Sequence, residues 1–385
     1  MVASAYSRND FDHNPMIVFY EMTRACDLAC VHCRADAQHA CHPQELSPAQ
    51  SLQLVHELLR FPKPPLLVLT GGDPLKRADV FDLVEYAVGQ KLSVAMTPSA
   101  TPLVTREAVE RLCNSGLHRL AVSLDGARAD THDAFRKVAG SYQRTLDIIA
   151  DAHAVGLPMQ INTTIGRHNL HELDEMLEVV TKLGAILWSV FFVVPTGRAT
   201  ASLRLSAEEC EDVFKRLYQR SQSHSIPIKT TEAPHYRRFI LQQPRNTAKA
   251  PQRKMPPGQI GTNDGKGILF VGHTGEIYPS GFLPIECGRF PRDSLVEIYQ
   301  DHELFRELRD GDRLHGKCGA CEFRNICGGS RARSYALTGD PLAPEPDCIY
   351  VPDGYVEENH HAEHHESVMR SSGGQRGVAL RTYPE

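Results

Sequence analysis

Three cysteines near the start of the chain stand at a spacing that suits metal chemistry. Cys26, Cys30 and Cys33 lie within eight residues, with His32 between the last two. Three thiolates on one loop can bind three irons of a [4Fe–4S] cluster and leave the fourth iron open to a ligand. A zinc site is an alternative in which His32 supplies the fourth ligand, and buried structural cysteines are another. The spacing favours the iron–sulfur cluster.

A second group of cysteines lies near the other end of the chain. Cys318, Cys321 and Cys327 form a C-x2-C-x5-C pattern, and Cys348 follows after twenty residues. Four thiolates can hold a structural zinc ion or a fully ligated iron–sulfur cluster. The chain has eleven cysteines, an odd number that is unevenly spread. This distribution favours metal ligation over a disulfide framework.

Six short β-rich segments alternate with amphipathic helical segments in the first half of the chain. We expect strands at 16–20, 66–69, 92–96, 119–124, 159–165 and 188–194. Successive β-then-α units predict a parallel sheet with right-handed crossovers. Six units are too few for a closed eight-stranded barrel, so the expected fold is α/β, an open partial barrel. The first cysteine loop then follows the first strand, at the edge of the sheet where ligands bind.

The spacing C-x3-C-x2-C resembles the signature of the radical S-adenosylmethionine (SAM) superfamily. Thr70-Gly71-Gly72-Asp73-Pro74, directly after the second expected strand, is similar to the GGEP motif of that family, with aspartate in place of glutamate. The resemblance implies a partial (β/α)6 barrel and a [4Fe–4S] cluster whose open iron chelates SAM. One electron would cleave SAM to methionine and a 5′-deoxyadenosyl radical, which abstracts hydrogen from a substrate. The three cysteines of the first loop would be the catalytic residues.

The same resemblance implies a set of SAM-binding residues at the C-terminal ends of the strands. His32 occupies the position where family members place an aromatic residue against the adenine, and Arg136 is the expected partner of the SAM carboxylate. Glycines let the backbone approach the methionine amino group, and a nearby acid assists. The full set is His32, Gly71, Gly72, Asp73, Pro74, Thr97, Ser123, Asp125, Arg136 and Asn162.

After such a core, the second cysteine group resembles the SPASM extension, which carries auxiliary iron–sulfur clusters. The full SPASM pattern has further cysteines that serve a second auxiliary cluster. This chain has Ser280 and Arg331 at two of those positions, and 261–267 contains no cysteine. The four cysteines of the second group are retained, which implies one auxiliary [4Fe–4S] cluster. Two other thiols, Cys41 and Cys287, receive no role.

Shifts in composition divide the chain into five parts. We expect an N-terminal extension at 1–15, the radical SAM core at 16–222, a basic linker or lid at 223–263, a small Cys-rich α+β auxiliary-cluster domain at 264–352 and a disordered His- and Ser-rich tail at 353–385. Between Ala233 and Asn263 stand six Lys or Arg residues and no acid. We expect two of them, Arg237 and Arg238, to pair with substrate carboxylates at the barrel mouth.

The composition of the 385-residue chain is that of an ordinary globular protein. Lys and Arg number 42 against 47 Asp and Glu, which gives a net charge of −5 and predicts no attraction to nucleic acid or membrane surfaces. The first residues lack a signal-peptide pattern. We therefore expect a cytoplasmic protein whose thiols stay reduced.

The sequence leaves three hypotheses for the function, and a heme-pathway enzyme is the first of them. The order of domains resembles the radical SAM enzymes of the heme and heme d1 pathways, which act on tetrapyrrole side chains. Maturation of a ribosomally made peptide is the alternative, although the extension at 1–15 is too short for a leader-binding domain. A non-catalytic structural zinc protein is the third hypothesis. An enzyme of this class also needs an electron donor such as flavodoxin or ferredoxin.

Overall fold

The computed structural model describes residues 6–223, 226–244 and 261–356. Within these residues, one ten-stranded sheet has the strand order β10-β9-β8-β1-β2-β3-β4-β5-β6-β7. The strands are β1 (Ile17–Thr23), β2 (Leu66–Gly71), β3 (Val94–Met96), β4 (Arg119–Ser123), β5 (Met159–Ile165), β6 (Leu187–Phe192), β7 (Ile228–Thr231), β8 (Ile268–Val271), β9 (Glu276–Tyr278) and β10 (Gly288–Arg289).

Helices follow most strands of the parallel part and continue into the C-terminal unit. The α-helices are α1 (Pro48–Leu58), α2 (Val80–Gly89), α3 (Arg106–Asn114), α4 (Ala129–Arg136), α5 (Ser141–Ala154), α6 (Leu173–Lys182), α7 (Ala207–Ser223), α8 (His235–Gln242), α9 (Leu295–Asp301), α10 (Glu303–Arg309), α11 (Gly316–Ala320) and α12 (Arg331–Thr338). Short 3-10 helices span Arg8–Asp12, Pro74–Lys76, Leu170–Glu172, Ala201–Leu203 and Gly311–Arg313.

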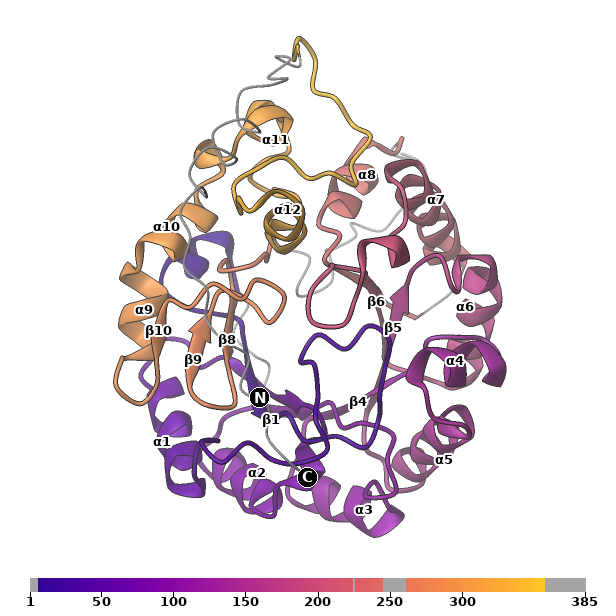
Figure 1. Ribbon diagram of the computed structural model, residues 1–385, viewed down its shortest axis with the longest axis vertical. Helices are drawn as coiled ribbons and strands as arrows, with labels where there is room; N and C mark the ends of the chain where they lie inside the picture. Colours follow the sequence, from indigo (N-terminus) through magenta and orange to yellow (C-terminus); the bar gives the residue numbers. More distant parts are fainter. Residues whose placement is uncertain (1–5, 224–225, 245–260, 357–385) are drawn as a thin grey trace, which may run out of the picture.

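The parallel part of the sheet forms an open partial barrel, as expected. Strands β1 to β7 are parallel and adjacent in chain order. The sheet curves around a central lumen, and the helices lie on its outer side (Figure 1). β8 also pairs in parallel with β1, so the sheet has two more parallel strands than the six we expected. The segment at 223–263 is therefore more than a linker, because it contains β7 and α8.

The two faces of each strand meet different surroundings. Along β5, Met159, Ile161, Thr163 and Ile165 are buried, while the side chains between them are partly exposed. Successive side chains of a strand point to opposite faces of the sheet. The buried series packs under the helices, where one large apolar cluster spans the sheet. The other series faces the lumen.

The C-terminal unit lies across the barrel near the ends of β6 and β7. Arg333 lies in the first turn of α12, and its side chain is completely buried. Its guanidinium donates to the backbone oxygens of Val193 at 3.3 Å and Glu232 at 2.6 Å, and it pairs with Glu345 at 3.0 Å. One side chain thus connects two strand ends of the barrel to the C-terminal unit, and Figure 1 shows α12 between β8 and β6.

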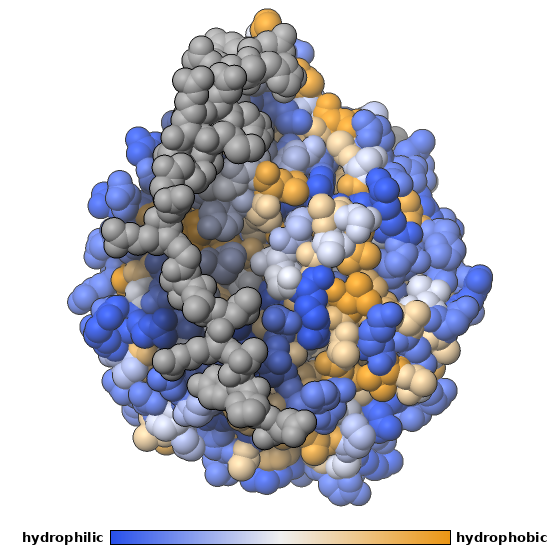
Figure 2. Space-filling view, viewed as in Figure 1, coloured by the Kyte–Doolittle hydropathy of each residue, from blue (hydrophilic) through white to orange (hydrophobic). Residues whose placement is uncertain are grey.

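The outer surface has the mixed character of a water-exposed protein. In the view of Figure 2, hydrophilic side chains cover most of the visible face and hydrophobic ones form smaller patches. Among the helices that the structure describes, none is long and apolar enough to cross a membrane.

Candidate functional site

The first cysteine loop follows β1 directly and brings its three sulfurs into one cluster. Cys26 and Cys30 are buried with Leu28 and Ala37, and Cys33 packs against them. Each sulfur lies near an N–H group that can donate to it. The donors to Cys26, Cys30 and Cys33 are, in that order, the backbone N–H of Leu28 at 3.3 Å, Nη1 of Arg136 at 3.6 Å and the backbone N–H of Ala37 at 3.4 Å. Such donors stabilise thiolates, the form in which cysteine binds iron.

A second strand end holds this loop in place. Arg198, in the segment after β6, donates from Nε to the backbone oxygen of Cys30 at 3.0 Å and from Nη1 to that of Ala37 at 3.1 Å. Arg198 was not among the expected site residues, because nothing in the local sequence links it to a loop about 170 residues earlier. Its role is visible only in the fold.

The Gly71-Gly72-Asp73 turn packs directly against β1 and the cysteine loop. A Cβ atom at Gly71 would lie 2.3 Å from the backbone oxygen of Thr23, and one at Gly72 would lie 2.4 Å from that of Ala25. Gly71 also has a φ of 141°, which disfavours any other residue. Both glycines are therefore required for the close approach of the two backbones.

A cavity of about 110 Å³ opens beside this turn. Five of the expected SAM-binding residues line it: Gly71, Gly72, Thr97, Ser123 and Arg136. The other lining residues are Leu28, Thr70, Pro98, Ser99, Ala100, His132 and Ser141. Most of them belong to strand ends and to the loops that follow, so the cavity lies at the C-terminal edge of the sheet.

Asp73 and Pro74 do not line this cavity. Asp73 is fully buried, and its carboxylate accepts hydrogen bonds from the hydroxyl of Thr101 at 2.6 Å and the backbone N–H of Leu75 at 3.2 Å. Burial raises the pKa of this carboxyl. The geometry makes Asp73 a support of the turn, whereas the resemblance placed it against SAM.

Arg136 and Asp125 form an ion pair at the wall of the cavity. Asp125 is fully buried, and its carboxylate accepts hydrogen bonds from Nε of Arg136 at 2.7 Å and from the backbone N–H of Thr164 at 2.7 Å. Burial by itself would raise the pKa of Asp125, but the Arg136 guanidinium, the neighbouring histidines and the hydrogen bond from Thr164 together outweigh it, and the pKa falls to about 2. Asp125 therefore stays ionised and fixes the orientation of Arg136 between the cavity and Cys30.

Three flat rings stack beside the cysteine loop. The ring of His32 lies 4.1 Å from that of Phe135, which lies 3.7 Å from that of His168. Burial lowers the pKa of His32 to about 3 and that of His168 to about 4, so both are neutral at pH 7. Among the described residues, Nδ1 of His32 and both ring nitrogens of His168 have no hydrogen-bond partner. These buried nitrogens and planar surfaces fit a heteroaromatic ring such as adenine.

The second cysteine group gathers in the C-terminal unit around α11. The thiols of Cys321 and Cys327 both interact electrostatically with those of Cys318 and Cys348. Each sulfur again has an N–H donor. The donors to Cys318, Cys321, Cys327 and Cys348 are the backbone N–H groups of Glu345 at 3.2 Å, Phe323 at 3.4 Å and Gly329 at 3.4 Å, and Nη2 of Arg238 at 3.9 Å. The donor set again suits thiolates that bind an iron–sulfur cluster.

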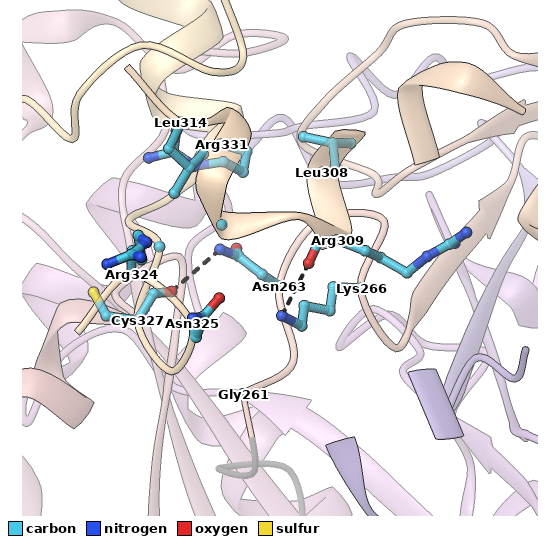
Figure 3. Close-up of a pocket in the computed structure, with 12 residues that line it drawn as sticks. Gly261, Asn263, Lys266, Leu308, Arg309, Leu314, Arg324, Asn325, Cys327 and Arg331 are labelled. Atoms are coloured by element: carbon cyan, nitrogen blue, oxygen red, sulfur yellow. Dashed lines mark hydrogen bonds between the residues drawn. The ribbon is translucent and has the colours of Figure 1, made fainter. Parts of the chain in front are cut away.

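Ser280 and Arg331 stand where the full SPASM pattern has cysteines, and both side chains form hydrogen bonds within the protein. Arg331 is 1% exposed and donates to the backbone oxygens of Pro341 at 3.1 Å and Ala343 at 2.8 Å. The Ser280 hydroxyl accepts the backbone N–H of Leu283 at 3.2 Å. A small cavity of about 10 Å³ lies beside Arg331, and Cys327 is the one cysteine among the residues lining it (Figure 3).

Polar side chains of that cavity hold its loops together. Asn263 Nδ2 donates to the backbone oxygen of Gly329 at 2.7 Å, and Lys266 Nζ donates to that of Arg309 at 3.2 Å. Figure 3 shows both side chains between α10 and the loop of Cys327. The cavity therefore has the character of a structural junction.

The expectation for Arg237 and Arg238 is wrong. Their exposed fractions are 6% and 3%, so neither reaches the barrel mouth. Arg237 donates to the backbone oxygens of Thr262 at 2.7 Å and Ile326 at 3.1 Å. Arg238 pairs with Glu211 at 2.6 Å. The two arginines belong to α8 and tie the second cysteine loop to α7. The remaining basic residues of that segment, Arg245, Lys249, Arg253 and Lys254, lie outside the described residues.

Single-ion metal sites receive no support from the described residues. Within them, no group of three or more histidine, cysteine, aspartate or glutamate side chains is arranged to hold one metal ion. In an iron–sulfur cluster each thiolate binds its own iron, so the sulfurs lie farther apart than around one zinc ion. Nothing therefore supports the structural zinc hypothesis.

Comparison with known proteins agrees with this geometry. The pattern of the Radical SAM superfamily matches residues 20–180. The chain belongs to this superfamily and is an enzyme that uses SAM and a [4Fe–4S] cluster.

Two relatives and one solved structure illustrate the similarity. The AdoMet-dependent heme synthase of Methanosarcina barkeri is 39% identical over 88% of this chain and 97% of its own length. The pre-heme d1 synthase of Dinoroseobacter shibae is 28% identical over 86% of this chain and 85% of its own length. Streptococcus suis SuiB bound to its precursor peptide SuiA has a similar fold, with a TM-score of 0.67 and 16% identity over 88% of this chain and 76% of that one.

Proposed function

We propose that this enzyme abstracts hydrogen from a carboxylate-bearing side chain of an iron porphyrin, as a step of heme formation. The observation that carries the proposal is the 39% identity to AdoMet-dependent heme synthase, which extends over nearly the whole of that protein. The similarity to pre-heme d1 synthase supports the same substrate class at lower identity.

The lumen of the barrel supports a flat, amphipathic substrate. Phe19 of β1 is next to Phe270 of β8, and both stand on the face of the strands opposite the helices. Phe191 of β6 contacts Phe282 at a ring distance of 6.4 Å. Polar side chains occupy the other wall, where Gln160 Nε2 donates to Asn162 Oδ1 at 2.6 Å. Aromatic and polar walls together suit a macrocycle with carboxylates at its edge.

The residues of the first site have distinct tasks in this proposal. Cys26, Cys30 and Cys33 would hold the catalytic [4Fe–4S] cluster. When bound, that cluster and SAM supply a 5′-deoxyadenosyl radical that removes hydrogen from the substrate. Gly71 and Gly72 bring backbone groups to the cavity where the methionine part of SAM would lie.

Arg136 and the stacked histidines would complete the SAM site. Arg136 carries a permanent positive charge into the cavity wall and is the assigned partner of the SAM carboxylate. His32 and His168, being neutral, would pair with adenine without placing a charge near the sulfonium. A closely packed cavity also keeps water away from the radical.

The second cysteine group would hold one auxiliary [4Fe–4S] cluster with four protein ligands. The four N–H donors around these sulfurs support this assignment, and they balance part of the charge of four thiolates. A soluble donor of the flavodoxin or ferredoxin type would supply the electron that starts each turnover.

The experiment is turnover with a defined porphyrin. The reconstituted, dithionite-reduced enzyme receives SAM and iron coproporphyrin III, a porphyrin with propionate side chains. We expect porphyrin-dependent formation of 5′-deoxyadenosine, measured by chromatography, and a porphyrin product of lower mass, measured by mass spectrometry. Formation of 5′-deoxyadenosine that is unaffected by the porphyrin, with no change in porphyrin mass, would contradict the proposal.

Peptide maturation is the second candidate function. The fold similarity to SuiB in complex with its precursor peptide favours it, but sequence identity is far lower than to the heme synthase. Mass spectrometry of a small peptide encoded beside this gene, co-expressed with the enzyme, distinguishes the two. A modified peptide together with an unmodified porphyrin would favour the peptide maturase.

A further inference from the structure

Two basic side chains face the lumen from opposite parts of the polar wall. On β4, Leu120 and Val122 pack in the apolar cluster under the helices, so Arg119 stands on the lumen face. On β7, Ile228 packs in that cluster, and Lys229 therefore faces the lumen. Both side chains are partly buried. They lie close enough for Arg119 to influence the charge of Lys229.

Neither cation has a side-chain partner among the residues that the structure describes, since no side-chain hydrogen bond or ion pair joins Arg119 or Lys229 to any of them. The lumen carboxylate on β1 behaves differently. Glu21 is 1% exposed and pairs with Arg34 at 2.8 Å and with Arg24 at 3.1 Å. The protein thus neutralises its own carboxylate on one wall and leaves two cations unpaired on the other.

The pKa of Lys229 is lowered, as expected for a buried amine that has no anionic partner in the protein. Burial, and then the positive charges of Arg119 and Arg237, lower the pKa of Lys229 to about 8. Glu232 is the carboxyl that opposes this effect. Its own pKa is raised by burial and by Asp264, so Glu232 carries little negative charge near neutral pH. Unpaired, partly buried charges destabilise a fold, which favours a ligand as the missing partner.

The sheet register places Lys229 level with the SAM cavity. Ser123, which lines that cavity, pairs with Asn162 on β5. Asn162 pairs with Ser189 on β6, and Ser189 pairs with Lys229 on β7. One row of the sheet therefore runs across the lumen from the cavity to Lys229. Arg119 is the first residue of β4, so it lies below this row, toward the N-terminal ends of the strands.

We propose that Arg119 and Lys229 form a carboxylate-binding subsite in the lumen, which orients a carboxylate side chain of the substrate. The subsite rests on the proposed function, because it takes the substrate to be an iron porphyrin with several carboxylates. Arg119 offers a planar fork of donors that suits a carboxylate, and Lys229 adds a compact charge. Gln160 and Asn162 provide neutral polar groups between the two strands.

The test combines charge-removing and charge-keeping variants. Arg119→Met and Lys229→Met remove the charges, whereas Arg119→Lys and Lys229→Arg keep them. Arg144→Met and Lys182→Met are matched controls, because both residues are exposed on the outer helices. Binding of iron coproporphyrin III is measured by visible-absorption titration of the holoenzyme, and binding of heme, which has fewer carboxylates, is measured alongside.

We expect each charge-removing variant to bind iron coproporphyrin III about tenfold or more weakly, as for the loss of a charged hydrogen bond. Heme affinity should fall less, and the charge-keeping variants should retain most of the coproporphyrin affinity. The melting temperature of Lys229→Met should be equal to or above that of wild type, since an unpaired charge is removed. A merely structural lysine would give a lower melting temperature instead.

The outcomes distinguish a failure of the carboxylate subsite from a failure of the proposed function. Wild-type enzyme that binds iron coproporphyrin III, with both methionine variants matching Arg144→Met in affinity, would overturn the subsite and leave the proposed function intact. Wild-type enzyme that binds no porphyrin would overturn the proposed function itself. If a methionine variant fails to fold, the glutamine variants Arg119→Gln and Lys229→Gln take its place, and an affinity ratio for coproporphyrin against heme equal to that of wild type in both of them would overturn the subsite.

Discussion

The two cysteine groups of this enzyme surround their sulfurs in the same way but lie in different settings. In each group an N–H two residues after a cysteine donates to its sulfur, as Leu28 does for Cys26 and Phe323 for Cys321. Each group also has one arginine within reach of a sulfur. The first group has three cysteines, and Leu28 of its loop lines the cavity beside Gly71 and Gly72, whereas the second has four cysteines and is tied into the C-terminal unit.

In the proposed assignment, this difference lets one chain hold a reactive cluster and a closed one. Local turns can supply backbone donors wherever a loop contains cysteines, so the common features follow from short-range geometry. The number of thiolates and the neighbouring open space then decide whether an iron remains accessible. The contrast between an open and a closed group leads to three predictions, beginning with the largest effect.

Removal of the cysteines of the first group should abolish reductive cleavage of SAM. Replacing Cys26, Cys30 and Cys33 with alanine leaves no ligand for the catalytic cluster, so 5′-deoxyadenosine formation under dithionite should fall to the background level. Chromatography of the quenched reaction measures the product. The same variant should keep the iron of the second group. Significant 5′-deoxyadenosine from this protein would contradict the assignment of the open site.

Removal of the second group should halve the iron content. Three plus four cysteines predict two [4Fe–4S] clusters, or about eight irons per chain after anaerobic reconstitution, and about four when Cys321 and Cys327 are changed to alanine. Iron and zinc are measured by mass spectrometry. A wild-type value near twelve irons would mean that Ser280 and Arg331 do not mark a lost site. A wild-type value near four irons with one zinc per chain would mean that the second group binds zinc.

The smallest effects should come from the two arginines. Arg136→Gln removes the partner of the buried Asp125 and a donor to Cys30, so SAM affinity should fall about tenfold or more. Arg238→Gln removes the partner of Glu211 and should lower stability by about 2 kcal/mol with SAM affinity changed less than about twofold. Calorimetric titration and denaturant unfolding measure these quantities, with Arg144→Gln as control. Equal losses of SAM affinity in both variants would erase the contrast between the groups.

The sequence indicated much of the barrel, since local signals determine strands and helices. The expected strand at 159–165 coincides with β5 (Met159–Ile165), because its apolar residues alternate with polar ones. β7 was missed because it has four residues and lies in a segment whose composition is basic and rich in proline. Neighbouring strands stabilise such a short strand, and that contribution is absent from its own residues.

The sequence by itself determined the chemistry of the cysteine loops and of the Gly71-Gly72 turn, because spacing within a few residues sets which thiolates and backbone groups can converge. Only the tertiary structure decided which charges are used internally and which are left over. Arg237 and Arg238 are bonded inside the protein, while Arg119 and Lys229, separated by about a hundred residues, face one lumen. Pairing of charges depends on distances between strands that no local pattern encodes.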